Sequence, residues 1–197
     1  MGTKKRKIIS ASITSINVLA LGAVATLATI ELRKNNTQSG ELYQRVQSAD
    51  EANVGIAEAL SALQVHVATH MNASPLPQLG DNAPVQLSKS YERAKASEVA
   101  RVTSERQRVT NEGIAVCEAQ YGTSQLTIRS QCIANYGASH PVQPEKEIIA
   151  DLYRYDFVSP VWTPDKAGWL VLVAIILTAT LVLRVVSKIL ATFLIKN

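Results

Sequence analysis

Two pairs of side chains in this sequence have the types and spacing that could do chemistry. His66 and His70 are four residues apart in a predicted helix, a spacing that places two imidazoles on one face, where they could share a metal ion. A metal needs further ligands, and the sequence offers only His140, Glu58 and Met71 at irregular distances. Alternatively, both histidines end a helix and interact with its dipole. We favour that structural interpretation, expect no metal or other cofactor, and keep a metal-dependent membrane enzyme as an alternative.

The second pair is Cys117 and Cys132, the only cysteines of the chain. Their separation of fifteen residues does not fit a CxxC redox centre, and two lone cysteines make a poor zinc site. Since a turn-forming stretch lies between them, an antiparallel helical hairpin could bring them within bridging distance. We predict a disulfide if they lie outside the cytoplasm, with reduced core thiols as the alternative. With no recognisable catalytic motif in the sequence, we do not expect an enzyme.

Two apolar runs decide where these residues lie. Residues 8–30 carry no charge and are long enough to cross a hydrocarbon core of roughly 30 Å, and residues 167–183 form a second uncharged run. After the second run, Arg184 and Lys188 are expected to reach the headgroups, with residues 184–197 as an amphipathic tail on the membrane. Two alternatives stay open: a second span that extends to residue 195, and a cleaved signal peptide in place of the first span.

The charges flanking the two runs predict the orientation. Residues 4–7 are all Lys or Arg, the second run is followed by Arg184, Lys188 and Lys196, and neither flank contains an acidic residue. Positive flanks remain in the cytoplasm, so we expect a multi-pass protein of a bacterial plasma membrane, with residues 31–166 outside the cytoplasm. Residues 32–166 hold 13 basic and 15 acidic side chains, a net charge of 13 − 15 = −2. The basic isoelectric point therefore reflects topology, and we expect no nucleic-acid partner.

The extracytoplasmic segment is predicted to be all-α. Turn-forming residues at 33–40 should loosen or break the first helix, and prolines within 72–84 should end the next one. Between them a heptad seam predicts one helix over about 39–71. Asn53 lies in this seam, where it would fix register and oligomeric state, unless it simply reaches solvent. The seam consists of Leu42, Val46, Ala49, Asn53, Ile56, Leu60, Leu63, Val67 and His70.

Three further helices are predicted, over about 86–120, 125–137 and 144–157. The first has glutamates at heptad spacing on its seam, Glu98, Glu105 and Glu112, which must be exposed or paired with something polar. The fold class expected is therefore an all-α membrane protein, with two long and two short helices forming an antiparallel bundle on a transmembrane hairpin.

Half of the aromatic residues crowd into the stretch before the second apolar run. Their spacing fits neither a helix nor a strand, and aromatic rings are typical of the membrane interface. We therefore predict an interfacial belt, with a docking surface for a membrane partner as the alternative. The residues are Tyr153, Tyr155, Phe157, Trp162 and Trp169.

This order of elements resembles the four-helix-bundle ectodomains of bacterial chemoreceptors and sensor kinases. The resemblance implies a ligand-sensing ectodomain, but those receptors continue into signal-relay and output domains, which this sequence does not show after its second span. Sensing would then be relayed to a separate partner. Our first expectation is instead a non-enzymatic accessory or scaffolding subunit of a cell-envelope or membrane complex. It would associate through its helical ectodomain with a second copy or with other subunits, in contact with the lipid bilayer.

Overall fold

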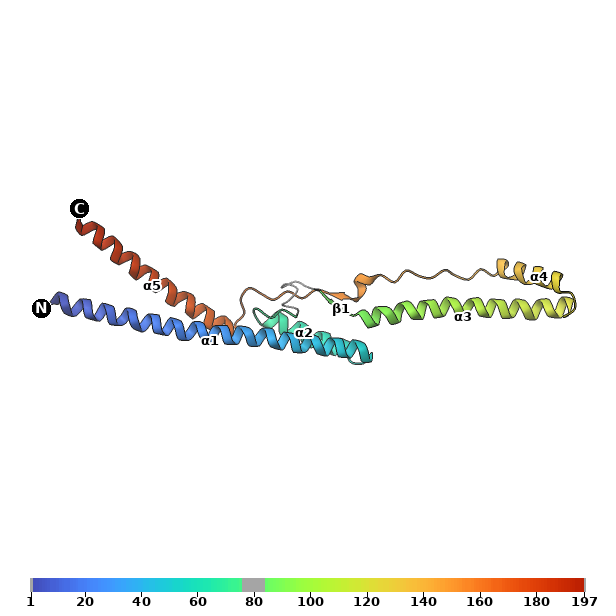
Figure 1. Ribbon diagram of the computed structural model, residues 1–197, viewed down its shortest axis with the longest axis horizontal. Coiled ribbons are helices and arrows are strands. Elements are labelled where there is room, and N and C mark those ends of the chain that lie inside the picture. Colours follow the sequence, from blue (N-terminus) through green and yellow to red (C-terminus); the bar gives the residue numbers. More distant parts are fainter. Residues whose placement is uncertain (1, 76–83, 197) are drawn as a thin grey trace. The chain divides into compact units, whose positions relative to one another are not determined.

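The computed structural model describes residues 2–75 and 84–196, with side chains described from residue 12 to residue 193 of these ranges. Within them the chain is all-helical apart from one short pair of strands, and contains five α-helices, labelled in Figure 1. Two of these, α1 and α5, contain stretches long and apolar enough to cross a membrane. The expected fold class, all-α with two candidate spans, is confirmed at this level.

The chain divides into two compact units. Unit 1 consists of residues 1–85 and 155–197, and unit 2 of residues 86–154. The helices expected to form one bundle are shared between them in pairs, since α1 contacts α2 within unit 1 and α3 contacts α4 within unit 2. A single bundle of all four stays a prediction.

Helix α1 (Gly2–Ala52) is 51 residues long and has no break at residues 33–40, so the predicted break there is wrong. Turn propensity is overridden because this stretch is packed and bonded within the helix. Asn35 and Ser39 are both buried, and the Thr37 hydroxyl donates to the Arg33 carbonyl oxygen at 3.0 Å. The helix therefore runs from the apolar run directly into the polar part of the chain.

The helix predicted over 39–71 is interrupted at residues 53–55. Asn53 adopts a left-handed backbone with φ 55°, and the Val54 N–H donates to the Ala49 carbonyl oxygen at 3.2 Å, as in a Schellman C-terminal cap. Gly55, with φ 68°, then leads into α2 (Ile56–Thr69). The result is a tight helical hairpin. Asn53 is thus a turn residue, and the helical seam that motivated its role in oligomer register does not pass through it.

The heptad face itself was correctly predicted, but it packs against its own chain. Val46 of α1 and Leu63 and Val67 of α2 are at most 1% exposed. Because α2 folds back on α1, the two halves of the predicted seam face each other across the hairpin. The pattern that indicated a coiled coil is satisfied within one molecule.

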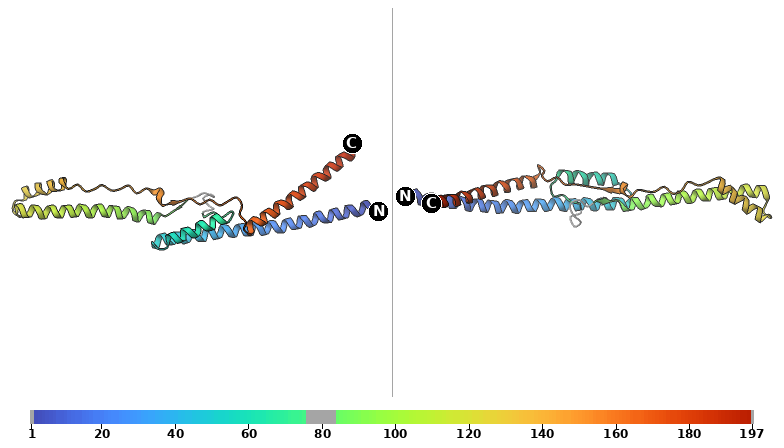
Figure 2. Two further views of the ribbon diagram at one scale, coloured as in Figure 1. Left: turned by 180° about the vertical axis from the view of Figure 1, so that it is seen from behind. Right: turned by 90° about the horizontal axis from the view of Figure 1, so that it is seen from above.

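Helix α5 (Lys166–Lys196) runs antiparallel to α1, as Figures 1 and 2 show. Ala28 and Ala167 are buried where the two helices lie closest to the polar part of unit 1. Nearer the termini, Asn17 Nδ2 donates to Thr180 Oγ1 at 3.0 Å. α5 has no break at Arg184, so residues 184–196 belong to the same helix as the apolar run instead of forming a separate one.

Unit 2 is a long helix against which the following chain folds back. α3 (Ser88–Tyr121) and α4 (Leu126–Ser139) match the two predicted helices to within about two residues at each end. The helix predicted over 144–157 is wrong, since a 3-10 turn, Ala150–Tyr153, and a two-residue strand form there instead. The chain before this turn is extended because its backbone is bonded to side chains of α3, as described below.

Two short strands, β1 (Val85–Gln86) and β2 (Arg154–Tyr155), pair where the chain passes between the units. No strand was expected from the sequence. Segments of two residues are too short to show an alternating pattern, so this difference is expected.

Candidate functional site

Unit 1 contains a cluster of polar residues where α1, the end of α2 and the start of α5 meet. We call this cluster the polar junction; it consists of Asn35, His66, His70, Met71, Ser159, Thr163 and Asp165. Two of its residues adjoin the candidate spans in sequence: Asn35 follows the apolar part of α1, and Asp165 directly precedes α5. Each of its elements is joined to another by hydrogen bonds.

Asn35 is the centre of the polar junction. Its side chain is buried, and its amide nitrogen Nδ2 donates to the Met71 carbonyl oxygen at 3.1 Å and to Asp165 Oδ2 at 2.9 Å. Both amide hydrogens are therefore used. Its backbone oxygen lies 3.0 Å from His66 Nε2, which must carry the proton because a carbonyl oxygen only accepts. One residue of α1 thus holds both α2 and the start of α5.

Asp165 caps the N-terminus of α5. Its Oδ1 accepts from the Gly168 N–H at 2.8 Å and from the Thr163 hydroxyl at 2.9 Å, while Oδ2 accepts from Asn35. Burial alone would raise the pKa of this carboxyl, but the hydrogen bonds from Gly168, Asn35 and Thr163, with the nearby His70, lower it overall. Asp165 is therefore ionised at neutral pH, where its charge interacts favourably with the helix dipole.

The segment before α5 also satisfies the C-terminal end of α2. The Ser159 hydroxyl donates to the His70 carbonyl oxygen at 2.8 Å and accepts from the Ala73 N–H at 3.2 Å. The Met71 N–H donates to Thr163 Oγ1 at 3.0 Å. Backbone groups at a helix end lack partners within the helix, so these side chains replace water there.

The turn into α5 requires glycine at position 168. A Cβ atom on Gly168 would overlap the carbonyl oxygen of Thr163, a backbone atom that cannot move away cheaply. Around this turn Trp162 Nε1 donates to the Gly168 carbonyl oxygen at 3.2 Å, and the rings of Trp162 and Trp169 meet edge to face at 5.9 Å. The two tryptophans thus pack against each other around the turn into α5.

The five predicted interface aromatics do not form one group. Besides the tryptophan pair, Phe157 is 7% exposed within unit 1, Tyr155 lies exposed in β2, and Tyr153 belongs to unit 2. There the Tyr153 ring meets the Tyr91 ring edge to face at 5.7 Å. The prediction of an interfacial belt remains for the tryptophans, whereas Phe157 and Tyr153 have packing roles.

The two histidines bond to backbone. Their rings stack with centroids 4.3 Å apart. His66 Nε2 bonds to the backbone oxygen of Asn35, and His70 Nδ1 lies 3.0 Å from the backbone oxygen of His66. His66 is buried and His70 only partly buried, although the predicted heptad seam passes through His70. No group of three or more potential metal ligands occurs in the part of the chain that the structure describes.

The cysteines lie together as the sequence predicted. The sulfur atoms of Cys117 and Cys132 are at disulfide distance, 2.05 Å, with their Cα atoms 5.9 Å apart. They link α3 to α4 beside Gly113, where a Cβ atom would lie 3.0 Å from Cδ1 of Tyr136. A side chain at Gly113 would therefore require the Tyr136 ring to shift by a few tenths of an ångström.

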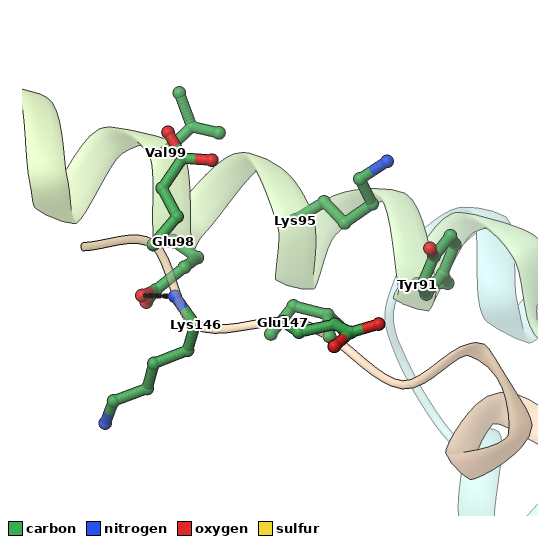
Figure 3. A pocket seen from close by; sticks show the side chains of 8 residues that line it. Tyr91, Lys95, Glu98, Val99, Lys146 and Glu147 are labelled. Carbon is green, nitrogen blue, oxygen red and sulfur yellow. Dashed lines mark hydrogen bonds between the residues drawn. The ribbon is translucent and has the colours of Figure 1, made fainter.

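Unit 2 contains a groove of about 350 Å³ between α3 and the extended residues 145–148 (Figure 3). At its edge Glu98 Oε1 accepts from the Lys146 N–H at 2.8 Å, and Arg101 donates to both Glu98 oxygens and to the Pro144 carbonyl oxygen. Hydrogen bonds from Arg101 and the Lys146 backbone lower the pKa of Glu98 to about 2. This carboxylate is a structural acceptor and too weak a base for proton transfer near neutral pH.

The other seam glutamates are paired with arginine, one of the two outcomes the sequence left open. Arg108 donates to Glu105 at 2.6 Å and to Glu112 at 2.6 Å. Of the remaining predicted site residues, Arg184 and Lys188 lie exposed on α5.

The polar junction was not predicted from the sequence. Asp165 three residues before Gly168 matches a helix N-cap, a signal that could have been recognised. The sequence around Asn35 did not indicate a buried hydrogen-bonding residue, because an asparagine followed by Asn36 and Thr37 is typical of a turn. A comparison of the chain with protein-family models, with curated proteins and with solved structures finds no match to any of them.

Proposed function

We propose that this chain is a non-enzymatic, two-span membrane protein that acts by association, as an accessory or scaffolding subunit of a membrane or cell-envelope complex. In this proposal α1 and α5 cross the bacterial plasma membrane as a hairpin with both termini in the cytoplasm. Residues 31–166 then lie outside the cytoplasm. The basic flanks of both apolar runs support this orientation.

Large apolar side chains on the outer faces of α1 and α5 support membrane insertion. Leu19 is 74% exposed, Ile176 54% and Leu183 66%. Each lies in the apolar stretch of its helix, so these exposed side chains form apolar surfaces. Such a surface is unfavourable in water and is matched by lipid tails. The antiparallel contact between α1 and α5 is the arrangement that a transmembrane hairpin requires.

The observation that best supports the proposed association is the exposure of apolar side chains on α4. None of its side chains is buried, yet it is fixed against α3 through Cys132 and exposes Ile128 by 50% and Leu126 by 67%. Helices of stable domains bury an apolar stripe, so a helix on which no side chain is fully buried is typical of a surface completed by a partner. The expected helical bundle would then be completed by helices of a second copy or of another subunit.

The pairing of polar groups favours association over catalysis. In the polar junction and along the groove of unit 2, His66, Asp165 and Glu98 each bond to backbone groups of the chain. A catalytic acid or base instead needs to reach a substrate.

Chemical crosslinking in native membranes, followed by gentle detergent extraction, tests this function. We expect a stoichiometric partner or a second copy crosslinked to unit 2, and its loss in Ile128→Asn. The control Ile149→Asn changes a residue of similar exposure, 55%, outside the helices and should retain the partner. Recovery of the wild-type chain alone and uncrosslinked would contradict the proposal.

A sensory function is the second candidate, favoured by the polar junction. Because Asn35 bonds to both Met71 and Asp165, a displacement of α2 would be transmitted to the start of α5. A dimer whose crosslinking pattern changes with an added small molecule, without other subunits, would favour this function over scaffolding.

A further inference from the structure

The contact surface between α1 and α5 changes character along the membrane. In the half near the polar junction, the side of α1 that is partly covered carries apolar residues, Leu21, Val24 and Ala28. In the half near the termini the contact is polar, between Asn17 and Thr180. The other side-chain atom of that amide, Asn17 Oδ1, is buried and has no hydrogen-bond partner among the described residues.

Beyond this contact the same face of α5 becomes cationic. Arg184 follows Thr180 by one helical turn and Lys188 follows by another, so all three share one face, while Val186, Leu190 and Phe193 lie on the opposite face. Figure 1 shows that α5 diverges from α1 toward their ends. Both cations are exposed and neither forms an ion pair with a described side chain. The cationic face therefore continues the face that contacts α1.

The depth of these residues fits a headgroup. Arg184 lies 18 residues after Lys166, about 27 Å along the helix, close to the roughly 30 Å of a hydrocarbon core. Since the helices are antiparallel, the four cations of residues 4–7 lie at the same end. Residues 1–30 and 166–197 contain no Asp or Glu, so this positive charge is not compensated by an acidic residue within these two segments.

We propose that Arg184 and Lys188, one and two helical turns beyond the Thr180 that bonds to Asn17, form a binding site for the phosphate headgroup of an anionic phospholipid between the two spans. The guanidinium of Arg184 binds a phosphate through two parallel hydrogen bonds, and Lys188 adds a second charge. The remaining N–H groups of Arg184, or a headgroup hydroxyl, supply the donor that Asn17 Oδ1 lacks. Basic sites between spans on the cytoplasmic side are a common form of lipid recognition. This inference rests on the proposed membrane insertion.

Native mass spectrometry of the full chain in mild detergent tests the site. We expect phosphatidylglycerol to bind at least tenfold more tightly than phosphatidylcholine, and the double variant R184Q/K188Q to lose this preference, a loss of roughly tenfold or more for two charges. The control R33Q/K34Q removes two exposed cations from α1 near the polar junction and should keep it. Asn17→Leu should weaken binding of phosphatidylglycerol with both cations present.

The outcomes separate this inference from the proposed function. Equal binding of both lipids by the wild type, or an equal loss in the control, overturns the lipid site. Displacement of phosphatidylglycerol by millimolar inorganic phosphate would overturn it too, by showing a free-anion site. Carbonate extraction of native membranes is the parallel measurement: a chain released by carbonate refutes the membrane proposal and the lipid site together, whereas a retained chain without lipid preference refutes the lipid site alone.

Discussion

Replacing Asn35 by leucine should destabilise unit 1 far more than the same change at its neighbour. Leucine has a similar volume but no donor, so the Met71 carbonyl oxygen and the Asp165 carboxylate each lose a hydrogen bond in a buried site. A neutral hydrogen bond contributes about 1 kcal/mol and one to a charged group about 1.5–3 kcal/mol. We therefore expect Asn35→Leu to lower the free energy of unfolding by roughly 2–4 kcal/mol.

Asn36→Leu is the matched control. Asn36 is the next residue of α1, and its Oδ1 is buried without a partner among the described residues, so leucine there removes an unsatisfied group. Its effect should be neutral or slightly stabilising. The assay is helicity by circular dichroism during denaturation of the full chain in detergent. A second test combines Asn35→Leu with Asp165→Asn. Asp165→Asn should lower the free energy of unfolding less in the Asn35→Leu variant than in the wild type, because the hydrogen bond between the two residues is already lost. Equal losses for Asn35→Leu and Asn36→Leu would refute the role of the polar junction.

Further predictions concern the turn, the helix contacts and the charged groups. Asn53→Val should destabilise by about 1–2 kcal/mol, because a β-branched residue disfavours a left-handed backbone, whereas Asn53→Gly should not; thermal melts compare the two. Gly113→Ala should destabilise through its contact with Tyr136, while Gly40→Ala, which meets no atom within 4 Å, should stabilise by about 0.5–1 kcal/mol. Serine at both Cys117 and Cys132 should cost about 3 kcal/mol, and an unchanged melt would show that the sulfurs are not bridged. Because the pKa of Glu98 is lowered to about 2, its contribution to folding stability is complete above its ordinary pKa near 4.5 and is lost as the pH falls toward 2. Carboxyl NMR shifts recorded during acid titration should show a midpoint near 2. A midpoint near 4.5 would contradict the pairing with Arg101 and Lys146.

Periodicity predicted the helices but not their partners. Val46, Leu63 and Val67 of the heptad face from Leu42 to His70 are buried between α1 and α2, but the sequence did not show that the chain turns back on itself at Asn53. The signal was present, since Asn53 and Gly55 are the residues that accept a left-handed backbone, and the regular spacing across the turn concealed it. A heptad pattern identifies which face of a helix is buried, but it does not identify the segment that packs against that face.

Local propensity was misleading where long-range hydrogen bonds decide the structure. Residues 33–40 favour a turn in isolation, yet they stay helical because Asn35 is held by Met71 and Asp165, far away in the sequence. Residues 145–149 favour a helix, yet they are extended because Glu98 takes the Lys146 N–H. Neither partner could be identified from the sequence. The cysteine pair could be, because one short turn leaves a hairpin as the simplest path between them.

The central claim is that the chain is a membrane hairpin with its helical domain outside the cytoplasm. Single cysteines introduced at two exposed positions, Gln143 in unit 2 and Ala191 in α5, test it with a membrane-impermeant maleimide in intact cells. The parent chain serves as the control for labelling of Cys117 and Cys132. We predict that Gln143→Cys is labelled in intact cells and Ala191→Cys only after permeabilisation. Labelling of Ala191→Cys but not Gln143→Cys in intact cells would contradict the claim.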